Sequence, residues 1–232
     1  MLVALPRPAI YAITNPKGLR GEYQFAGSDA DCVCSSAFAV DRLGGAAQLL
    51  SLGGSATFAM QAKIRPMTAE DVPGYHHCLD VLGRERQFIA WLEAPPIEKC
   101  RTRVLSLLER HVPPYVATAS DAIIGSSEIV PVPRVGHEHR AELGMGVLPE
   151  YRRLGVGSRL LQASLDTARQ RRFERVELEV YAANQPAICL YQKFGFKTEG
   201  LRKRGRKFDG YYDDVVLMVL FLDVPPPEKL DA

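Results

Sequence analysis

The chain has 232 residues, of which 47% are hydrophobic and 24% charged, and its formal net charge at pH 7 is +2. This composition is typical of a globular protein, and so small a charge does not indicate a nucleic-acid or membrane-surface partner. No apolar run reaches the roughly 18 residues that suggest a membrane span, and the N-terminus lacks the features of a secretory signal. The five cysteines are odd in number and scattered, which predicts a reducing, cytoplasmic setting rather than a disulfide framework.

Residues 1–60 differ from the rest of the chain. They are rich in Gly, Ala and Ser and show no sustained periodicity, so we predict a poorly ordered extension rather than a domain. Met60 stands directly before the first strand-like run, and we expect it to be the natural start, with the first 59 residues outside the native protein. A cleaved organellar targeting segment is a weaker alternative, because acidic residues in the segment argue against it.

Residues 61–224 are predicted to form one domain, followed by a tail at 225–232. Thr68 before two acidic residues indicates a helix start, and Pro95-Pro96 and Pro113-Pro114 bound a further helix. The expected elements, in chain order, are a strand at 62–65, a helix after Thr68, a helix at 97–111, a hairpin at 115–118 and 122–130, a strand at 141–147, a helix at 155–172, a strand at 176–181, a helix at 186–194 and two final strands between Lys197 and Leu222. This order predicts an α/β protein with a mixed sheet and helices packed on it.

The most informative run is residues 148–161. Arg152 and Arg153 are followed by Gly155, Gly157 and an amphipathic helix. Glycines at this spacing let backbone N–H groups point at one spot, and the helix adds unpaired amides and the positive end of its dipole. Such a turn is predicted to bind a pyrophosphate. The third glycine of a dinucleotide fingerprint and the Gly-Lys-Ser/Thr triplet of a phosphate loop are both absent.

The turn at 152–157, the strands on either side of its helix, and the spacing Asn184-x-x-Ala187-x-x-x-Tyr191 together resemble the GNAT superfamily of acyl-coenzyme A dependent N-acetyltransferases. The resemblance runs from about Ile64 to Leu222. It implies the GNAT fold, a mixed, largely antiparallel central sheet flanked by helices, with acetyl-CoA as co-substrate and no metal. The cofactor-binding residues that it implies are Met145 and Val147 through their backbones, Arg152, Arg153, Gly155, Val156, Gly157, Ser158, Asn184 and Tyr191.

Three side chains are candidates for the chemistry. The resemblance implies that the Tyr191 phenol protonates the departing thiolate, although a packed aromatic is the alternative interpretation. Glu179 matches a position used as the base in ribosomal-protein acetyltransferases of this superfamily, and Glu142 could serve through a water. Either glutamate could instead be a sheet-face carboxylate with a structural partner. Asn184 can cap the helix that follows it, contact the cofactor, or do both.

Two segments bear on the acceptor. The basic run at 202–207 is expected to form a solvated hairpin between the last two strands, with attraction of an acidic substrate or of cofactor phosphate as alternatives. The segment Gly210–Asp214 and the region at 83–92, which we expect to be helical, resemble GNAT members that act on free amino acids or small amines. Tyr75, Phe88 and Trp91 would then line an acceptor pocket, or be core.

The leading hypothesis is an N-acetyltransferase that transfers acetyl to a primary amine of a small molecule by direct attack in a ternary complex. A protein N-terminal or lysine acetyltransferase is the first alternative. A non-catalytic module that binds CoA, or that uses the basic run on nucleic acid, is the second. Neither Cys32 with Cys34 nor His137 with His139 has the further ligands of a metal site, and a homodimer stays open.

Overall fold

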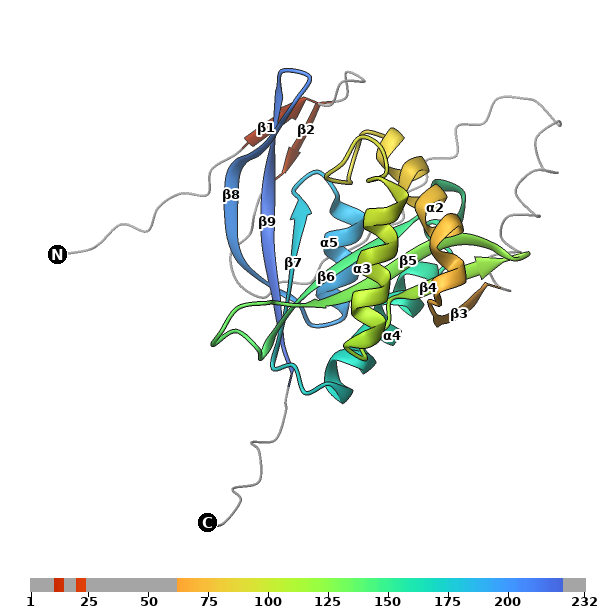
Figure 1. Cartoon of the computed structure of the whole chain (residues 1–232). Helices are drawn as coiled ribbons and strands as arrows, with labels where there is room; N and C mark the ends of the chain where they lie inside the picture. The colour runs from red at the N-terminus through yellow and green to blue at the C-terminus, as the bar shows by residue number, and fades with distance from the viewer. Residues whose placement is uncertain (1–10, 15–19, 24–61, 223–232) are drawn as a thin grey trace, which may run out of the picture. The chain divides into compact units, whose positions relative to one another are not determined.

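The computed structural model of the protein describes residues 11–14, 20–23 and 62–222 (Figure 1). The chain divides into two compact units, Met1–Asp41 and Arg42–Ala232. In the first unit, β1 (Tyr11–Thr14) pairs antiparallel with β2 (Arg20–Tyr23), a small sheet that the sequence patterns do not predict. The predictions for Met60, the Cys32/Cys34 pair and the tail lie outside the described residues. The division into extension, domain and tail stays a prediction.

The second unit is built on a seven-stranded sheet with the order β3-β4-β5-β6-β7-β9-β8. Its strands are β3 (Lys63–Pro66), β4 (Tyr115–Ala119), β5 (Ala122–Pro131), β6 (Arg140–Val147), β7 (Arg175–Tyr181), β8 (Lys197–Phe208) and β9 (Tyr211–Phe221). Every neighbouring pair in this sheet is antiparallel except β6 with β7. The predicted mixed, largely antiparallel sheet is therefore confirmed.

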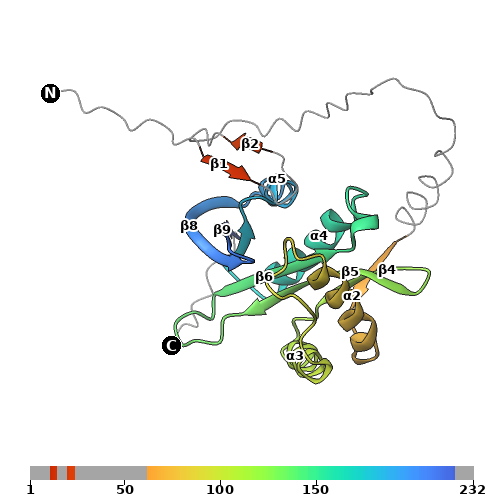
Figure 2. The ribbon, with the colours of Figure 1, turned by 90° about the horizontal axis from the view of Figure 1, so that it is seen from above.

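Helices cover both faces of this sheet. They are α2 (Val72–Arg84), α3 (Ile97–Glu109), α4 (Val156–Gln170) and α5 (Gln185–Lys193), with short 3₁₀ turns η1 (Ala69–Asp71) and η2 (Pro149–Tyr151). Figure 2 shows α2 and α3 on one face and α4 and α5 on the other. The buried side chains of β6 and β7 pack toward α4 and α5, in a cluster with Leu161, Leu165 and Tyr191. Alternate residues of these two strands therefore face the side of α2 and α3.

The predicted helix starts follow local polar chemistry. The Thr68 N–H donates to the Asp71 carboxylate at 2.8 Å, and the Arg65 guanidinium donates to the same carboxylate at 2.6 and 2.7 Å. These bonds hold the pKa of Asp71 down to about 2, with the bond from Arg65 as the largest cause. Asn184 caps α5, since its Oδ1 accepts from the Ala187 N–H at 3.3 Å. The capping role predicted for Asn184 is confirmed.

The basic run at 202–207 was expected between the last two strands but lies within β8; it is part of the β8–β9 hairpin and is exposed except at Arg206. The turn of the hairpin lies at Asp209 and Gly210, which both have positive φ. β9 pairs with the two ends of the run, at Arg202 and at Arg206 and Lys207, with a register shift between them, and nearby carboxylates accept from its guanidinium groups. Arg202 bonds Glu179, and Arg206 bonds Asp213.

The region at 83–92 is also not the helix that we expected, because α2 ends at Arg84. The following chain folds back against the helix end. A Cβ added at Gly83 would lie 3.0 Å from the Glu93 backbone nitrogen, so the absence of a side chain there permits this close return. The Asp80 carboxylate then accepts from the Ala94 N–H at 3.2 Å, which fastens the returning segment to α2.

Candidate functional site

The site begins where β6 and β7 part. These parallel strands pair only at Arg140 with Arg175, Ala141 with Val176 and Glu142 with Glu177. Beyond that point β6 continues along β5 as far as Val147, and β7 continues along β9 as far as Tyr181. A gap between the two strands therefore opens toward their carboxyl ends (Figure 1).

Backbone groups of β6 face this gap. The Leu148 N–H donates to the Ile124 carbonyl of β5 at 2.9 Å. Because the directions of N–H and C=O alternate along an antiparallel strand, the groups of Met145 and Val147 point away from β5 and into the gap. The Val147 carbonyl accepts from Nε of Arg152 at 2.8 Å. The two residues predicted to hold an amide-rich arm thus present their polar backbone groups to the gap between β6 and β7.

The turn after β6 exposes a row of amides. Gly155 is the N-cap of α4 with φ 80°, and Arg153 also has a positive φ of 63°. The first helical N–H that bonds back is that of Arg159, to the Gly155 carbonyl at 3.2 Å. Within the described part of the chain, the N–H groups of Val156, Gly157 and Ser158 have no backbone acceptor. Free amides at the positive end of a helix dipole fit an anion such as a pyrophosphate.

The two arginines of the turn differ in their surroundings. Both terminal nitrogens of Arg152 donate to the Glu85 carboxylate, at 2.6 and 2.5 Å, so this guanidinium is occupied within the protein. Arg153 is exposed. A phosphate contact by either arginine stays a prediction. Glu85 is a residue that sequence reasoning missed, because no spacing in the chain links it to a partner 67 residues away.

Tyr191 lies on α5 with its ring in the core. The residue is 8% exposed, and its ring centroid lies 5.7 Å from that of Phe196. Burial raises the pKa of the phenol, which therefore stays protonated throughout the usual pH range. The ring packs in the core beside Phe196, and a role of the hydroxyl as proton donor stays a prediction.

The two candidate bases lie on the face of the sheet opposite α5. Glu142 is exposed and has Glu177 as its register partner, so it stands where the strands are still paired. Glu179 stands two residues further along β7, beside the gap, and is 56% exposed, with Arg202 Nη1 at 2.8 Å from its Oε2. Glu142 thus stands at the last paired position of the two strands, and Glu179 lies two residues further, beside the gap.

The aromatic residues proposed for an acceptor pocket have different positions. Tyr75 is buried in a core cluster of α2, α3 and β4, whereas Trp91 is 44% exposed and Phe88 is half-buried. On the face of β6 that α2 covers, a Cβ added at Gly146 would lie 2.6 Å from Leu82 Cδ1 and 3.9 Å from Ile89 Cδ1. Gly146 therefore lets α2 and the chain that follows it approach the strand directly.

The residues that the structure describes add no metal site to this gap. His137 contacts Nη1 of Arg140 through Nδ1 at 2.6 Å. Within residues 62–222 and the two short N-terminal strands, no three His, Cys, Asp or Glu side chains gather as metal ligands would. Among the same residues, none of the helices has the length and apolar character needed to cross a membrane.

The family model of the acetyltransferase (GNAT) family matches residues 78–196, which include the strand gap, the amide turn and Tyr191. The chain belongs to this family. Members of the family are acetyl-CoA-dependent acyltransferases, which agrees with the resemblance drawn from the motifs.

Curated relatives carry several substrate names. An N-alpha-acetyltransferase of Sulfurisphaera tokodaii is 50% identical over 56 residues, which are 24% of this chain and 34% of that protein. The L-amino acid N-acetyltransferase AaaT of Escherichia coli is 32% identical over 104 residues, 44% of this chain and 64% of that protein. The chain thus spans less than two thirds of these two relatives. The spermidine N(1)-acetyltransferase of Escherichia coli is 26% identical over 170 residues, 70% of this chain and 87% of that protein.

Solved structures agree with the fold. An acetyltransferase of the GNAT family from Streptococcus pneumoniae has a TM-score of 0.66 and 25% identity, over 69% of this chain and 99% of that one. The acetyltransferase yncA from Salmonella typhimurium, solved with its cofactor acetyl-CoA, has a TM-score of 0.67 at 17% identity, over 71% of this chain and 96% of that one. The likeness to yncA concerns the fold alone.

Proposed function

We propose that this protein transfers the acetyl group of acetyl-CoA to a primary amine of a small molecule by direct attack in a ternary complex. The observation that carries the proposal is the gap between β6 and β7, with the free amides of the 153–158 turn at its end and the Tyr191 hydroxyl from α5. A strand gap next to an anion-binding turn suits a long molecule that has amides in its arm and a pyrophosphate at its end.

The residues fit that cofactor. The backbone groups of Met145 and Val147 would hold the amide-rich arm, and the N–H groups from Arg153 to Ser158 would hold the pyrophosphate. Asn184, already the cap of α5, would add a contact to the arm. Acetyl-CoA supplies the acyl group as a thioester. No side chain fills the turn at Gly155, where an added Cβ would meet nothing within 4 Å.

Proton movement falls to three side chains. An aliphatic amine with a pKa near about 10 is mostly protonated at neutral pH, so a carboxylate must take its proton before it attacks. Glu179, beside the gap, would take this role, or Glu142 would act through a water from the last paired position. Tyr191, kept neutral by burial, would give its proton to the departing thiolate from the opposite face.

The proposal of a small-amine acceptor rests on the extent to which this chain matches the length of its relatives. The spermidine acetyltransferase is matched over 87% of its chain, whereas the N-alpha-acetyltransferase is matched over 34%. A match to a third of a protein says little about an acceptor site that distant segments build. Transfer to a protein N-terminus remains the second candidate, favoured by the 50% identity within that short match.

A thiol-release assay with the full chain tests the proposal. Acetyl-CoA is offered with free amino acids, with polyamines, and with peptides that carry a free N-terminus or an internal lysine. Turnover on one of the small amines is the expected result. Turnover on peptides alone contradicts the small-amine acceptor, and acetyl-CoA binding without turnover on any acceptor contradicts the enzyme role.

A further inference from the structure

Residues 85–92, here called the bridging segment, lead from the end of α2 toward α3. They lie on the side of the strand gap that faces these two helices. One end of the segment is held on the β6 side. The Glu85 carboxylate takes both terminal nitrogens of Arg152, which lies just after β6, and Ile89 approaches Gly146 of β6. The segment is therefore fixed to the same strand that faces the gap.

The other side of the bridging segment is held by one residue of β8. Arg206 Nη2 donates to the Gln87 carbonyl at 2.9 Å, and Nη1 donates to the Ile89 carbonyl at 3.3 Å. Nε of Arg206 donates to the Asp213 carboxylate at 2.7 Å, which keeps the guanidinium in place. The side chain of Arg206 is only 18% exposed, although its strand lies at the edge of the sheet. Arg206 therefore holds the bridging segment from a largely buried position, and this set of contacts is called the clamp.

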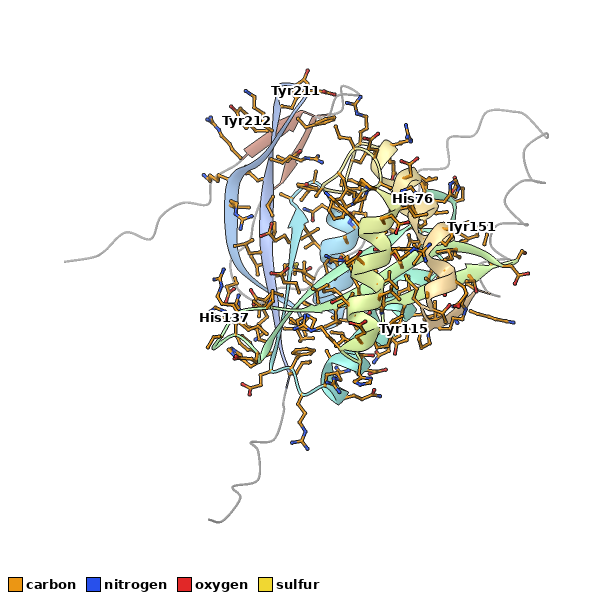
Figure 3. All side chains as sticks on the ribbon, in the orientation of Figure 1. His76, Tyr115, His137, Tyr151, Tyr211 and Tyr212 are labelled. Carbon is orange, nitrogen blue, oxygen red and sulfur yellow. The ribbon has the colours of Figure 1, made fainter. Side chains whose placement is uncertain are left out.

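Arg206 also covers the end of β7. Its guanidinium carbon lies 4.0 Å from the centroid of the Tyr181 ring, and Tyr181 is the last residue of β7. Arg86 of the bridging segment lies over Phe208 of β8 at 4.6 Å. Tyr211 and Tyr212 lie at the same end of the β8–β9 hairpin (Figure 3), as the register partners of Phe208 and Lys207. The bridging segment thus contacts both sides of the gap. Ile89 approaches β6 at Gly146 and Glu85 bonds Arg152 in the turn after β6, while Arg206 of β8 holds the other side.

We propose that Arg206 is a specificity-determining positioning residue, which holds the bridging segment closed so that a compact amine reaches the gap and a polypeptide chain does not. The inference rests on the proposed function and names the acceptor class of the same site. An extended peptide advances roughly 3.3 Å per residue, so even a few residues beyond the reacting amine must run alongside the gap, where the segment tied at both edges lies. Arg206 touches no reacting atom and acts through the segment that it holds.

The test compares Arg206→Gln and Arg206→Lys with Arg204→Gln. Glutamine removes the fork that reaches both carbonyls, whereas lysine keeps the charge beside Asp213 with a single donor group. Arg204 is a matched control on the same strand, since its guanidinium lies over Tyr212, 5.0 Å from the ring centroid. Steady-state KM and kcat are measured for acetyl-CoA, for the best small amine of the panel, and for a short peptide with a free N-terminus.

In Arg206→Gln we expect the KM of the small amine to rise about tenfold with the KM of acetyl-CoA within about twofold, and the ratio of peptide to amine kcat/KM to rise about tenfold. Arg206→Lys should lie between this variant and the wild type, and Arg204→Gln should match the wild type. Amide hydrogen exchange at residues 86–90 should accelerate in Arg206→Gln only, since opening of the segment exposes those amides.

Several results overturn the inference. The first is a wild-type preference for peptides over small amines. The second is an equal change in the KM of acetyl-CoA and in the KM of the amine in Arg206→Gln. The third is unchanged amide hydrogen exchange in the bridging segment of that variant. If Arg206→Gln does not fold, Arg206→Lys decides by the same measurements. A wild-type protein without turnover on any acceptor refutes the proposed function itself. An active wild type with unaltered variants refutes only the role of Arg206.

Discussion

Replacement of Tyr191 by phenylalanine removes one oxygen from the centre of the proposed site. The ring stays, so its packing in the cluster of α4, α5 and β7 and its contact with Phe196 are kept. We therefore expect the free energy of unfolding to change by less than about 0.5 kcal/mol.

The effect on catalysis should be much larger than the effect on stability. A positioned acid that protonates a leaving group contributes roughly 10²-fold or more to the rate. A loss of about 10² in kcat corresponds to about 2.7 kcal/mol in the activation barrier. Because burial raises the pKa of Tyr191, its loss should lower kcat evenly between about pH 6 and 9, where the phenol is neutral.

The assay is single-turnover acetyl transfer, with acetyl-CoA binding measured separately by calorimetry. Tyr115→Phe is the matched control, because its hydroxyl bonds Thr167 Oγ1 at 2.9 Å, on α4. The control should lose about 1 kcal/mol of stability and keep its kcat. A Tyr191→Phe enzyme with wild-type kcat would falsify the acid assignment. A loss that appears only in acetyl-CoA binding would reassign Tyr191 to cofactor binding.

Three further predictions concern stability and cofactor affinity. Asp71→Asn should lower the free energy of unfolding by about 2 kcal/mol at pH 7, because the folded pKa of Asp71 is lowered and its carboxylate stabilises the fold above the unfolded pKa. In urea titrations the difference from wild type should shrink as the pH falls from about 5 toward 2. A pH-independent difference contradicts the pairing with Arg65. Gly155→Ala forces a side chain into φ 80°, so calorimetry should show weaker acetyl-CoA binding and denaturation a loss of about 1–2 kcal/mol, while an unchanged affinity removes the turn from the cofactor site. Gly146→Ala places a Cβ 2.6 Å from Leu82 Cδ1, and thermal unfolding should report a loss of about 1–3 kcal/mol; full stability would mean that Leu82 moves away freely.

Much of the architecture was readable from short stretches of the chain. Thr68 and Asp71 mark the start of the first helical region, Asn184 caps α5, and the Gly155 turn precedes α4. Each of these signals acts within a few residues, through a cap, a turn or a periodic apolar stripe. The sheet followed because the order of such elements leaves few ways to pack them.

The two wrong predictions concern segments whose state depends on distant partners. The basic run at 202–207 was expected between the last two strands, but it lies within β8, where Arg202 and Arg206 pair with β9 and donate to the carboxylates of Glu179 and Asp213. Residues 85–92 were expected to be helical, but contacts from other elements hold them in an irregular path. Local composition carries no information about such partners.

The sequence by itself determined the family and the local form of the proposed cofactor side, because a glycine turn, a helix start and the spacing from Asn184 to Tyr191 are local chemistry. Only the tertiary structure decided the path of residues 85–92 on the proposed acceptor side. Glu85 meets Arg152 across 67 positions, and Gln87 meets Arg206 across 119. Pairs so far apart come together only after the whole sheet has formed, so no pattern within one element encodes them.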